Sequence, residues 1–434
     1  MLPKSISAFE HQTIPVGLGR GATAITSQEA ARLALISEDR PGFCTLGYQS
    51  VRLAQYAGLV GLGDRVLEIL PKVEPDDGNP EVGRGIFLRL LRLAGNLKIF
   101  TDGQVQHDLR RQSLLDVFIA AYFDAVASLV RTGLLRRYQT AEDDLTLIRG
   151  RLLIGRQAAT HAMRVDRLAC RFDELTADNV WNQSLKAALY AVKPWISSID
   201  LGRRWMELSA ALDDVSLLPA TPASLDALVF DRQAARYEPA IQWAKWILRL
   251  LSPNLRAGRS EAPGLIFDMN QLFESAVATT LRRRAAGLGD LRVSSQETGN
   301  YLTTLAASGG KRAFGLRPDI VIRQGGAVVA IGDTKWTRVG VNSSGYLIPD
   351  GAHIYQMQAY ASVYECEHLS LIYPWHSGLI GSRPTTFELP MIGNRRPVIN
   401  VILVNVGADS LASSPGAIPC AISTLLRCTA ALEP

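Results

Sequence analysis

The sequence predicts a multidomain protein that combines α+β and α/β architecture. Three observations support this. The first 105 residues hold short apolar segments broken by Gly and Pro, and residues 106–262 repeat apolar side chains at helical spacing. From 263 to 434 the pattern alternates between helix and strand, which indicates a mixed sheet flanked by helices. At 434 residues and roughly 150 residues per domain, these three regions are the predicted domains.

The composition is that of a folded globular chain. Hydrophobic residues make up 47% and charged residues 20%, which excludes a collagen-like or fully disordered protein. The net charge of +5 permits a nucleic-acid partner without requiring one. The five cysteines show no C-x-x-C spacing, so we expect reduced thiols rather than disulfides or a zinc site. The start lacks the apolar stretch of a signal peptide and no run is long enough to span a membrane, so we expect a cytoplasmic protein.

In the region 1–105, apolar runs such as 43–46 and 66–70 predict short strands, and 74–83 is interpreted as a surface loop. The region 106–262 is interpreted as helical. Its predicted helices are one that begins after Ser113 and stops at Gly133, and two others near 179–194 and 234–251.

The third region begins with a helix that Asp268 can cap. Strands are expected near 291–295, 301–305, 318–324 and 327–335. A second helix near 352–365 precedes strands near 369–373 and 398–404.

The stretch 317–335 carries the most chemical information. It reads as two β-segments joined by a Gln-Gly-Gly turn, and its centre at residue 326 lies midway between Asp319 and Asp333. The two carboxylates should therefore lie opposite each other, with Cβ atoms about 4.5–5.5 Å apart. Lys335 lies two residues beyond Asp333 and should point to the same face.

Two opposed carboxylates repel each other unless a cation neutralises them, and such a pair completed by water and substrate oxygens suits Mg²⁺. The metal can acidify a bound water, and a neighbouring lysine can polarise the water or a phosphate. Asp319, Asp333 and Lys335 therefore predict a phosphodiesterase site. The alternatives are that Asp319 caps a strand and that the other two form a charged strand end.

Two predicted helices add further candidates. Glu274, at the edge of its helix's apolar face, could be another metal ligand, or instead a solvated carboxylate at the rim. Gln356 and Tyr360 are four residues apart and share a helical face. They could contact nucleic-acid backbone, brace the site, or serve only in packing. His353 precedes them, and a site role for it is the less favoured reading.

The order Glu274, Pro318-Asp319, Asp333-Thr-Lys335, Gln356-x-x-x-Tyr360 resembles the PD-(D/E)xK nuclease superfamily, in its subgroup with a Q-x-x-x-Y helix. Further segments resemble McrC, the nuclease subunit of McrBC-type modification-dependent restriction systems. They are 66–72, 133–138, 148–152, 170–182 and 267–274.

This resemblance implies a division of labour. An McrB-like AAA+ GTPase ring would recognise double-stranded DNA with modified cytosine, and the N-terminal part of this chain would dock on the ring and stimulate GTP hydrolysis. The C-terminal PD-(D/E)xK domain would be a Mg²⁺-dependent endonuclease, with Asp319, Asp333 and Glu274 at the metal and Lys335 supporting the nucleophile. Cutting both strands would require a second nuclease subunit.

The sequence itself has no Walker A motif, because its Gly310-Lys311 pair is followed by Arg312 rather than Ser or Thr. The chain is therefore not expected to hydrolyse GTP alone. Two alternatives stay open. The chain could be mainly a GTPase-stimulating assembly factor, or a nuclease of the Q-x-x-x-Y type that acts without a partner. Four arginines, Arg136, Arg137, Arg149 and Arg151, are suggested as contacts to the GTPase.

Overall fold

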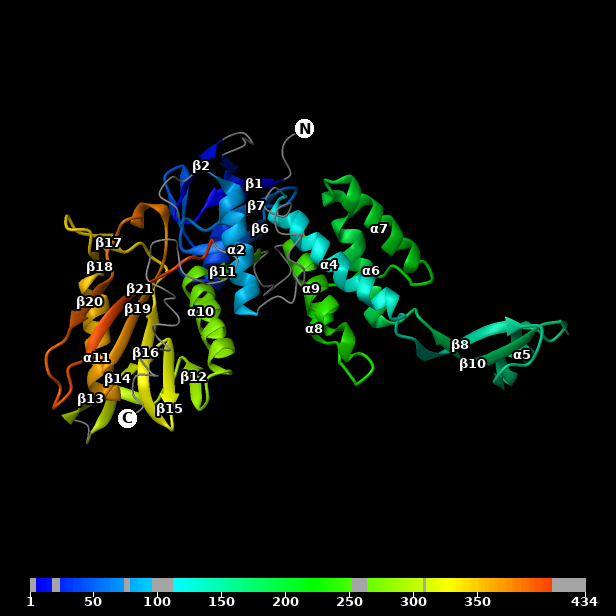
Figure 1. Cartoon of the computed structure of the whole chain (residues 1–434). Coiled ribbons are helices and arrows are strands. Elements are labelled where there is room, and N and C mark those ends of the chain that lie inside the picture. The colour runs from blue at the N-terminus through cyan, green and yellow to red at the C-terminus, as the bar shows by residue number, and fades with distance from the viewer. Residues whose placement is uncertain are drawn as a thin grey trace. The chain divides into compact units, whose positions relative to one another are not determined.

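The computed structural model describes residues 5–17, 24–73, 79–95, 112–164, 166–251, 264–306 and 310–407 (Figure 1). The chain packs into two units. The first unit comprises Met1–Leu59, Leu67–Ser113 and Ile266–Pro434, and the second comprises Val60–Val66 and Leu114–Leu265. Most of the predicted N-terminal region thus packs in one unit with the predicted nuclease domain. The predicted boundaries at 105/106 and 262/263 lie outside the described residues.

The N-terminal part is rich in strands, as predicted. One sheet has the order β1-β7-β6-β11 and another the order β3-β2-β5-β4. The strands are β1 (Ser5–Phe9), β2 (Thr13–Gly17), β3 (Ile25–Thr26), β4 (Cys44–Gly47), β5 (Ser50–Leu53), β6 (Tyr56–Gly61), β7 (Val66–Leu70) and β11 (Gly264–Asp268). Two helices accompany them, α1 (Ser27–Asp39) and α2 (Pro80–Ala94).

The prediction of a surface loop over 74–83 is wrong for residues 80–83, which belong to helix α2. Asn79 caps α2 by accepting a hydrogen bond from the backbone N–H of Glu81, and Pro80 opens the helix. Proline suits this first position because its fixed φ is helical and the N–H it lacks would have no helical partner. The rest of that loop, 74–78, lies outside the described residues.

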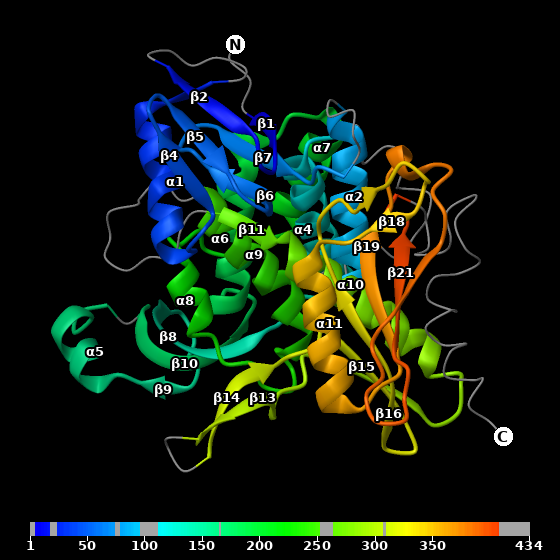
Figure 2. The same ribbon diagram turned by 90° about the vertical axis from the view of Figure 1, so that its left-hand side faces the viewer.

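The C-terminal part of the first unit contains the predicted mixed sheet (Figure 2). Its strand order is β12-β15-β16-β19-β21-β20. The pairs β16–β19 and β19–β21 are parallel, and the other pairs are antiparallel. The strands are β12 (Leu291–Ser295), β15 (Ile320–Gln324), β16 (Ala327–Thr334), β19 (His368–Pro374), β20 (Thr385–Glu388) and β21 (Val398–Val404).

Two helices and four smaller strands complete this part. Helix α10 (Met269–Ala285) packs against β12 and β16, and its N-cap Asp268 accepts from the N–H of Asn270. Helix α11 (Gly351–Tyr364) covers the sheet with a core that includes Met357 and Tyr360 against β16 and β19. Separate two-stranded ribbons are formed by β13 (Asn300–Leu305) with β14 (Lys311–Leu316), and by β17 (Gly340–Val341) with β18 (Leu347–Ile348).

The second unit contains the predicted helices. They are α4 (Leu114–Arg131), α6 (Val180–Val192) and α9 (Glu238–Leu251). Two further helices, α7 (Ile199–Ala211) and α8 (Pro222–Asp226), lie between α6 and α9 in the chain. Among the described helices of the chain, none is long and apolar enough to cross a membrane. The described cysteines Cys44, Cys170 and Cys366 are free thiols, and Cys420 and Cys428 lie outside the described residues.

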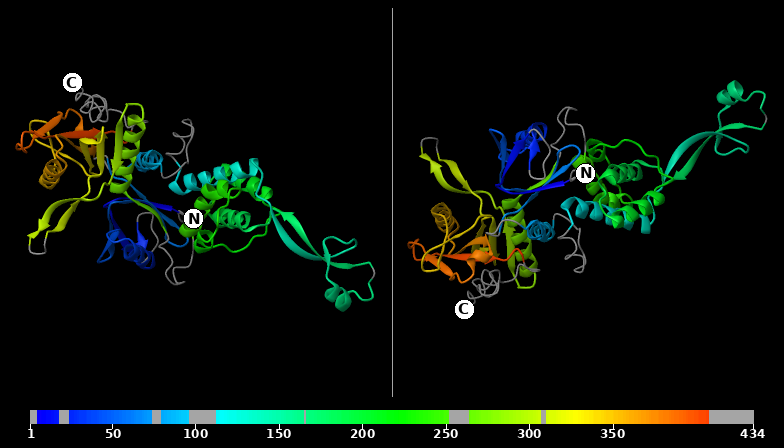
Figure 3. Two further views of the ribbon diagram at one scale, coloured as in Figure 1. Left: turned by 90° about the horizontal axis from the view of Figure 1, so that it is seen from below. Right: turned by 90° about the horizontal axis from the view of Figure 1, so that it is seen from above.

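Within the second unit, the prediction of an all-helical region is wrong for three strands, β8 (Arg137–Leu145), β9 (Arg151–Leu152) and β10 (Leu168–Thr176). These strands form an arm in the order β8-β10-β9. The arm extends away from the helices of its unit (Figure 3). Most side chains of β8 are exposed, so the sequence offers no apolar stripe of helical period. The nine-residue ladder with β10 supplies the backbone hydrogen bonds instead.

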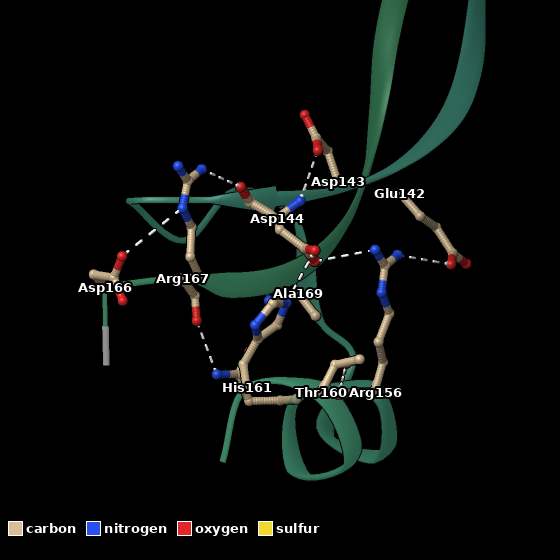
Figure 4. Close-up of polar contacts among 10 residues, drawn as sticks. Glu142, Asp143, Asp144, Arg156, Thr160, His161, Asp166, Arg167 and Ala169 are labelled. Carbon is tan, nitrogen blue, oxygen red and sulfur yellow. Dashed lines mark hydrogen bonds and ion pairs between the residues drawn. The ribbon is translucent and has the colours of Figure 1, made fainter. Parts of the chain in front are cut away.

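Charged side chains hold a short helix, α5 (Ile154–Thr160), onto this arm (Figure 4). The Asp144 carboxylate lies 3.1 Å from the guanidinium of Arg156 and 2.9 Å from Nε2 of His161. The side chain of Gln157 accepts a 2.7 Å hydrogen bond from the backbone N–H of Ala169. Because α5 buries none of its residues, these polar contacts replace an apolar interface.

Candidate active site

The hairpin of β15 and β16 brings the two predicted aspartates together. A two-residue turn joins the strands at Gly325 and Gly326, whose φ values of 55° and 90° suit glycine. The register pairs Ile320 with Gly332. The next position of the same register places Asp319 opposite Asp333, as the sequence predicts.

A β-bulge sets this register. Ile322 pairs with Ala330, whereas the next residue, Arg323, pairs with Val328, so Val329 is the extra residue. Without the bulge the tight turn would place Asp319 opposite a glycine, and Asp333 would face the other side of the sheet. A hairpin centred on residue 326, as expected from the sequence, therefore predicts the correct pair of aspartates. The turn itself is centred between Gly325 and Gly326, and the bulge accounts for the difference.

Asp319 is fixed across the end of β16. Its Oδ2 accepts hydrogen bonds from both the backbone N–H and the hydroxyl of Thr334, each 2.7 Å long. The carboxylate therefore binds the opposite strand rather than only capping its own. Thr334 was not a candidate in the sequence, because a threonine between an aspartate and a lysine carries no signal of its own.

Asp333 and Lys335 form a close ion pair. Lys335 Nζ lies 2.6 Å from Asp333 Oδ2, and the Asp333 side chain is only 1% exposed. Burial, together with the charge of Asp319, raises the pKa of Asp333 to about 6, while the Lys335 ammonium opposes that rise. Asp333 is thus an ionisable group whose charge depends on nearby cations.

The Q-x-x-x-Y face of α11 braces the lysine. Gln356 Oε1 accepts a 2.9 Å hydrogen bond from Lys335 Nζ, and Gln356 Nε2 donates to the hydroxyl of Tyr360 at 2.8 Å. The Tyr360 hydroxyl in turn donates to the carbonyl of Arg317 at 3.2 Å. Of the roles considered for these two residues, bracing the site is the one that these contacts support.

Glu274 lies at the site and not on an exposed rim. Its side chain is buried, and its Oε2 accepts a 2.9 Å hydrogen bond from Gln296 Nε2. The pKa of Glu274 is raised to about 7, first by burial and then by the charge of Asp319, with a smaller contribution from Asp333. The charges of both aspartates therefore act on this carboxyl.

Two residues that contact others around the site, Gln296 and Tyr373, carry no sequence signal. Arg317 donates to the side-chain oxygen of Gln296, whose φ of 54° is unusual for a residue other than glycine. On the side of α11, Nδ1 of His353 lies 2.8 Å from the hydroxyl of Tyr373. The pKa of His353 is lowered first by burial and then by the charge of Lys335.

The carboxylates fit a divalent metal that completes its shell with other oxygens. Among the described residues, no group of three or more His, Cys, Asp or Glu side chains is arranged as a ready-made metal site. The hard oxygen donors of Asp319 and Asp333, with Glu274 nearby, are nevertheless those that Mg²⁺ prefers. Burial is the first cause of the raised pKa values of Asp333 and Glu274, and the charge of Asp319 is the second; a bound cation would offset both effects.

Comparison with known proteins gives one family. The family model of the McrBC 5-methylcytosine restriction system component matches residues 51–374. A search of curated proteins found no match.

Among solved structures, the chain is similar to a chain in the refined half-complex from the tetradecameric assembly of Thermococcus gammatolerans McrB AAA+ hexamers with bound McrC. The TM-score is 0.71 at 19% identity, covering 99% of this chain and 100% of the other. At that identity the likeness shows the fold alone. A second match is to the cryo-EM structure of the Thermococcus gammatolerans McrBC complex. It has 21% identity, covers 65% of this chain and 88% of the other, and has a TM-score of 0.48, which is too low for a comparison of folds.

Proposed function

The chain belongs to the family of McrBC 5-methylcytosine restriction system components, and from that premise we propose that it is an McrC-like, Mg²⁺-dependent DNA endonuclease subunit. The observation that carries this proposal is the register that sets Asp319 opposite Asp333 while Lys335 pairs with Asp333 at 2.6 Å. Two acids and a lysine in this arrangement suit hydrolysis of a phosphodiester.

In the proposed mechanism, Asp319 and Asp333 would hold the metal, and Glu274 would be a further ligand or would order a water. When bound, Mg²⁺ would lower the pKa of a water and offset charge on the phosphate. Lys335 presents its ammonium to that water or phosphate, and Gln356 keeps the ammonium in place.

We further propose that the chain works with a partner. The similar structure contains McrB AAA+ hexamers with bound McrC, and an equivalent GTPase ring would select double-stranded DNA with modified cytosine for this protein. The region 1–105 would be the main docking region, and GTP hydrolysis by the ring would be stimulated on docking. A second copy of the nuclease subunit would cut the other strand, and the reaction would take place in the cytoplasm with the DNA.

Of the arginines suggested as partner contacts, Arg137 has a partner within this chain. Its guanidinium lies 2.5 Å from the carboxylate of Asp231 and stacks over the ring of Trp181. Arg149 also has partners within the chain, because its guanidinium lies 4.2 Å from the ring centroid of Phe172 and 3.8 Å from Glu174, but its side chain is 52% exposed against 28% for Arg137. Arg149 is therefore the better candidate of the two for a contact to the ring.

The proposal is tested with Asp333→Ala and Lys335→Ala, each assembled with the GTPase ring on plasmid DNA with modified cytosine. We expect both variants to lose cleavage and to keep GTPase stimulation. Glu388→Ala serves as a control, because Glu388 is 66% exposed and pairs only at the surface with Arg396. Persistent cleavage in the Asp333 variant would refute the site.

The same experiment separates the alternatives. A wild-type protein that stimulates the GTPase and cuts no DNA would be an assembly factor. Cleavage of linear DNA without nucleotide or ring would identify a nuclease that acts without a partner.

A further inference from the structure

A contact between two distant parts of the first unit reaches the candidate active site through Trp336. This residue directly follows Lys335 in the chain. The indole N–H of Trp336 donates to the carboxylate of Glu10, at 2.9 Å from Oε1 and 3.2 Å from Oε2. Glu10 is 1% exposed and Trp336 is 9% exposed, so the hydrogen bond is shielded from water.

Glu10 is itself firmly held in the N-terminal sheet. Its Oε1 accepts a 2.7 Å hydrogen bond from the backbone N–H of Lys72, and its own N–H donates to the carbonyl of Leu70 at 2.8 Å. Leu70 ends β7, a strand whose residues are all buried. The carboxylate is therefore a fixed acceptor on a rigid support, and its burial would be unfavourable without these donors.

The ring of Trp336 contacts the second element that carries a site acid. It packs against Phe273 of α10, with ring centroids 5.4 Å apart at 57°. Phe273 is fully buried and immediately precedes Glu274. Trp336 therefore lies between the end of β16 and the helix that carries Glu274.

The chain around Lys335 is held from two directions. The backbone N–H of Lys335 donates to the carbonyl of Ile372 at 2.9 Å, which continues the pairing of β16 with β19. Consecutive side chains of an extended chain project to opposite sides. Gln356 therefore holds Lys335 on one side, and Glu10 holds Trp336 on the other.

We infer that Glu10 is a positioning residue of the nuclease site, acting through Trp336 on Lys335 and through Phe273 on Glu274. This inference rests on the proposed function and adds to it, because it makes the N-terminal sheet part of the machinery that cuts DNA.

The test uses Glu10→Ala, Glu10→Gln and Trp336→Phe in the full chain with its ring partner, measured as single-turnover cleavage at saturating DNA and Mg²⁺. We expect Glu10→Ala and Trp336→Phe to cut about 10-fold or more slowly, because a misplacement of about 1 Å can cost about 100-fold. DNA affinity and GTPase stimulation should change less than about 2-fold. Glu10→Gln keeps an acceptor for the indole and should restore the rate to within about 3-fold of wild type.

The double variant Glu10→Ala/Trp336→Phe should be no slower than the slower single variant, since both remove one shared contact. Trp336→Phe also covers the case in which Glu10→Ala does not fold, because it keeps an aromatic ring against Phe273. Glu68→Gln is the matched control. Glu68 is a fully buried carboxylate of the same sheet that pairs with Arg84 at 2.7 Å, and its loss should lower stability without slowing cleavage.

The outcomes are distinguishable from those for the function itself. If wild type cuts DNA, Asp333→Ala does not, and both Glu10→Ala and Trp336→Phe cut at the wild-type rate, the positioning role is wrong and the nuclease stands. The positioning role is also wrong if Glu68→Gln slows cleavage as much as Glu10→Ala does. If wild type fails to cut, or Asp333→Ala still cuts, the proposed function is the part that fails.

Discussion

Replacing Glu10 by Gln should change how the stability of the protein depends on pH. Burial raises the pKa of Glu10 from 4.5 to about 7, against the opposing effects of the Lys72 N–H, Trp336 and Arg338; Asp268 adds to the rise. The folded protein therefore binds this proton more tightly than the unfolded chain does. This proton therefore stabilises the folded protein relative to the unfolded chain. The stabilisation is fully present below pH 4.5 and is lost as the pH rises through about 7.

The size of the effect follows from the two pKa values. A difference between 4.5 and about 7, at about 1.4 kcal/mol per pKa unit, corresponds to about 3 kcal/mol. Gln does not titrate. The free energy of unfolding of Glu10→Gln, relative to wild type, should therefore rise by about 3 kcal/mol between pH 4.5 and pH 8.

Urea denaturation of both proteins at half-unit pH steps measures this difference, and other titrating groups cancel in the comparison. NMR of the Glu10 carboxyl carbon should show a midpoint near pH 7. A stability difference that stays flat to within about 0.5 kcal/mol would refute the reasoning, because it would mean that Arg338 and the two N–H donors fully compensate the burial of Glu10.

Three further predictions concern the site and the arm. Asp333→Asn removes a charge buried beside Asp319, so at pH 8 without divalent metal the variant should melt at a higher temperature than wild type, and it should cut no DNA. Mg²⁺ should raise the melting temperature of wild type only, and an equal rise in both proteins would contradict Asp333 as a ligand. Gln356→Leu removes the acceptor that holds Lys335 besides Asp333, and it should slow cleavage about 10- to 100-fold at unchanged DNA affinity in fluorescence anisotropy. Tyr360→Phe should have a smaller effect, and a loss of affinity at an unchanged rate would indicate a DNA-backbone contact instead. Asp144→Ala should speed amide hydrogen exchange in α5, which buries none of its residues, and unchanged protection in mass spectrometry would show that this carboxylate does not hold the helix.

Part of the candidate site follows from short-range geometry. Spacing and turn chemistry predict the hairpin, the facing pair Asp319 and Asp333, and Lys335 beside them, because strand alternation and hairpin pairing involve residues close in the chain. Even here the bulge at Val329 was needed, and the sequence carries no mark of it. The helical spacing of Gln356 and Tyr360 predicts a shared face in the same way.

The interpretation of 137–176 as helical was wrong for the strands of the arm because β8 buries none of its residues and β10 buries only Ala169, Cys170 and Phe172, which is too short an apolar pattern to identify two nine-residue strands.

The sequence by itself determined the strands and helices with a clear apolar period and the local order of the acids and the lysine. Only the tertiary structure decided that Gln296 meets Glu274 and that Glu10 meets Trp336 across 326 positions of the chain. Such contacts depend on how sheets and helices pack against one another, and the pattern of residues within a single element does not encode that packing.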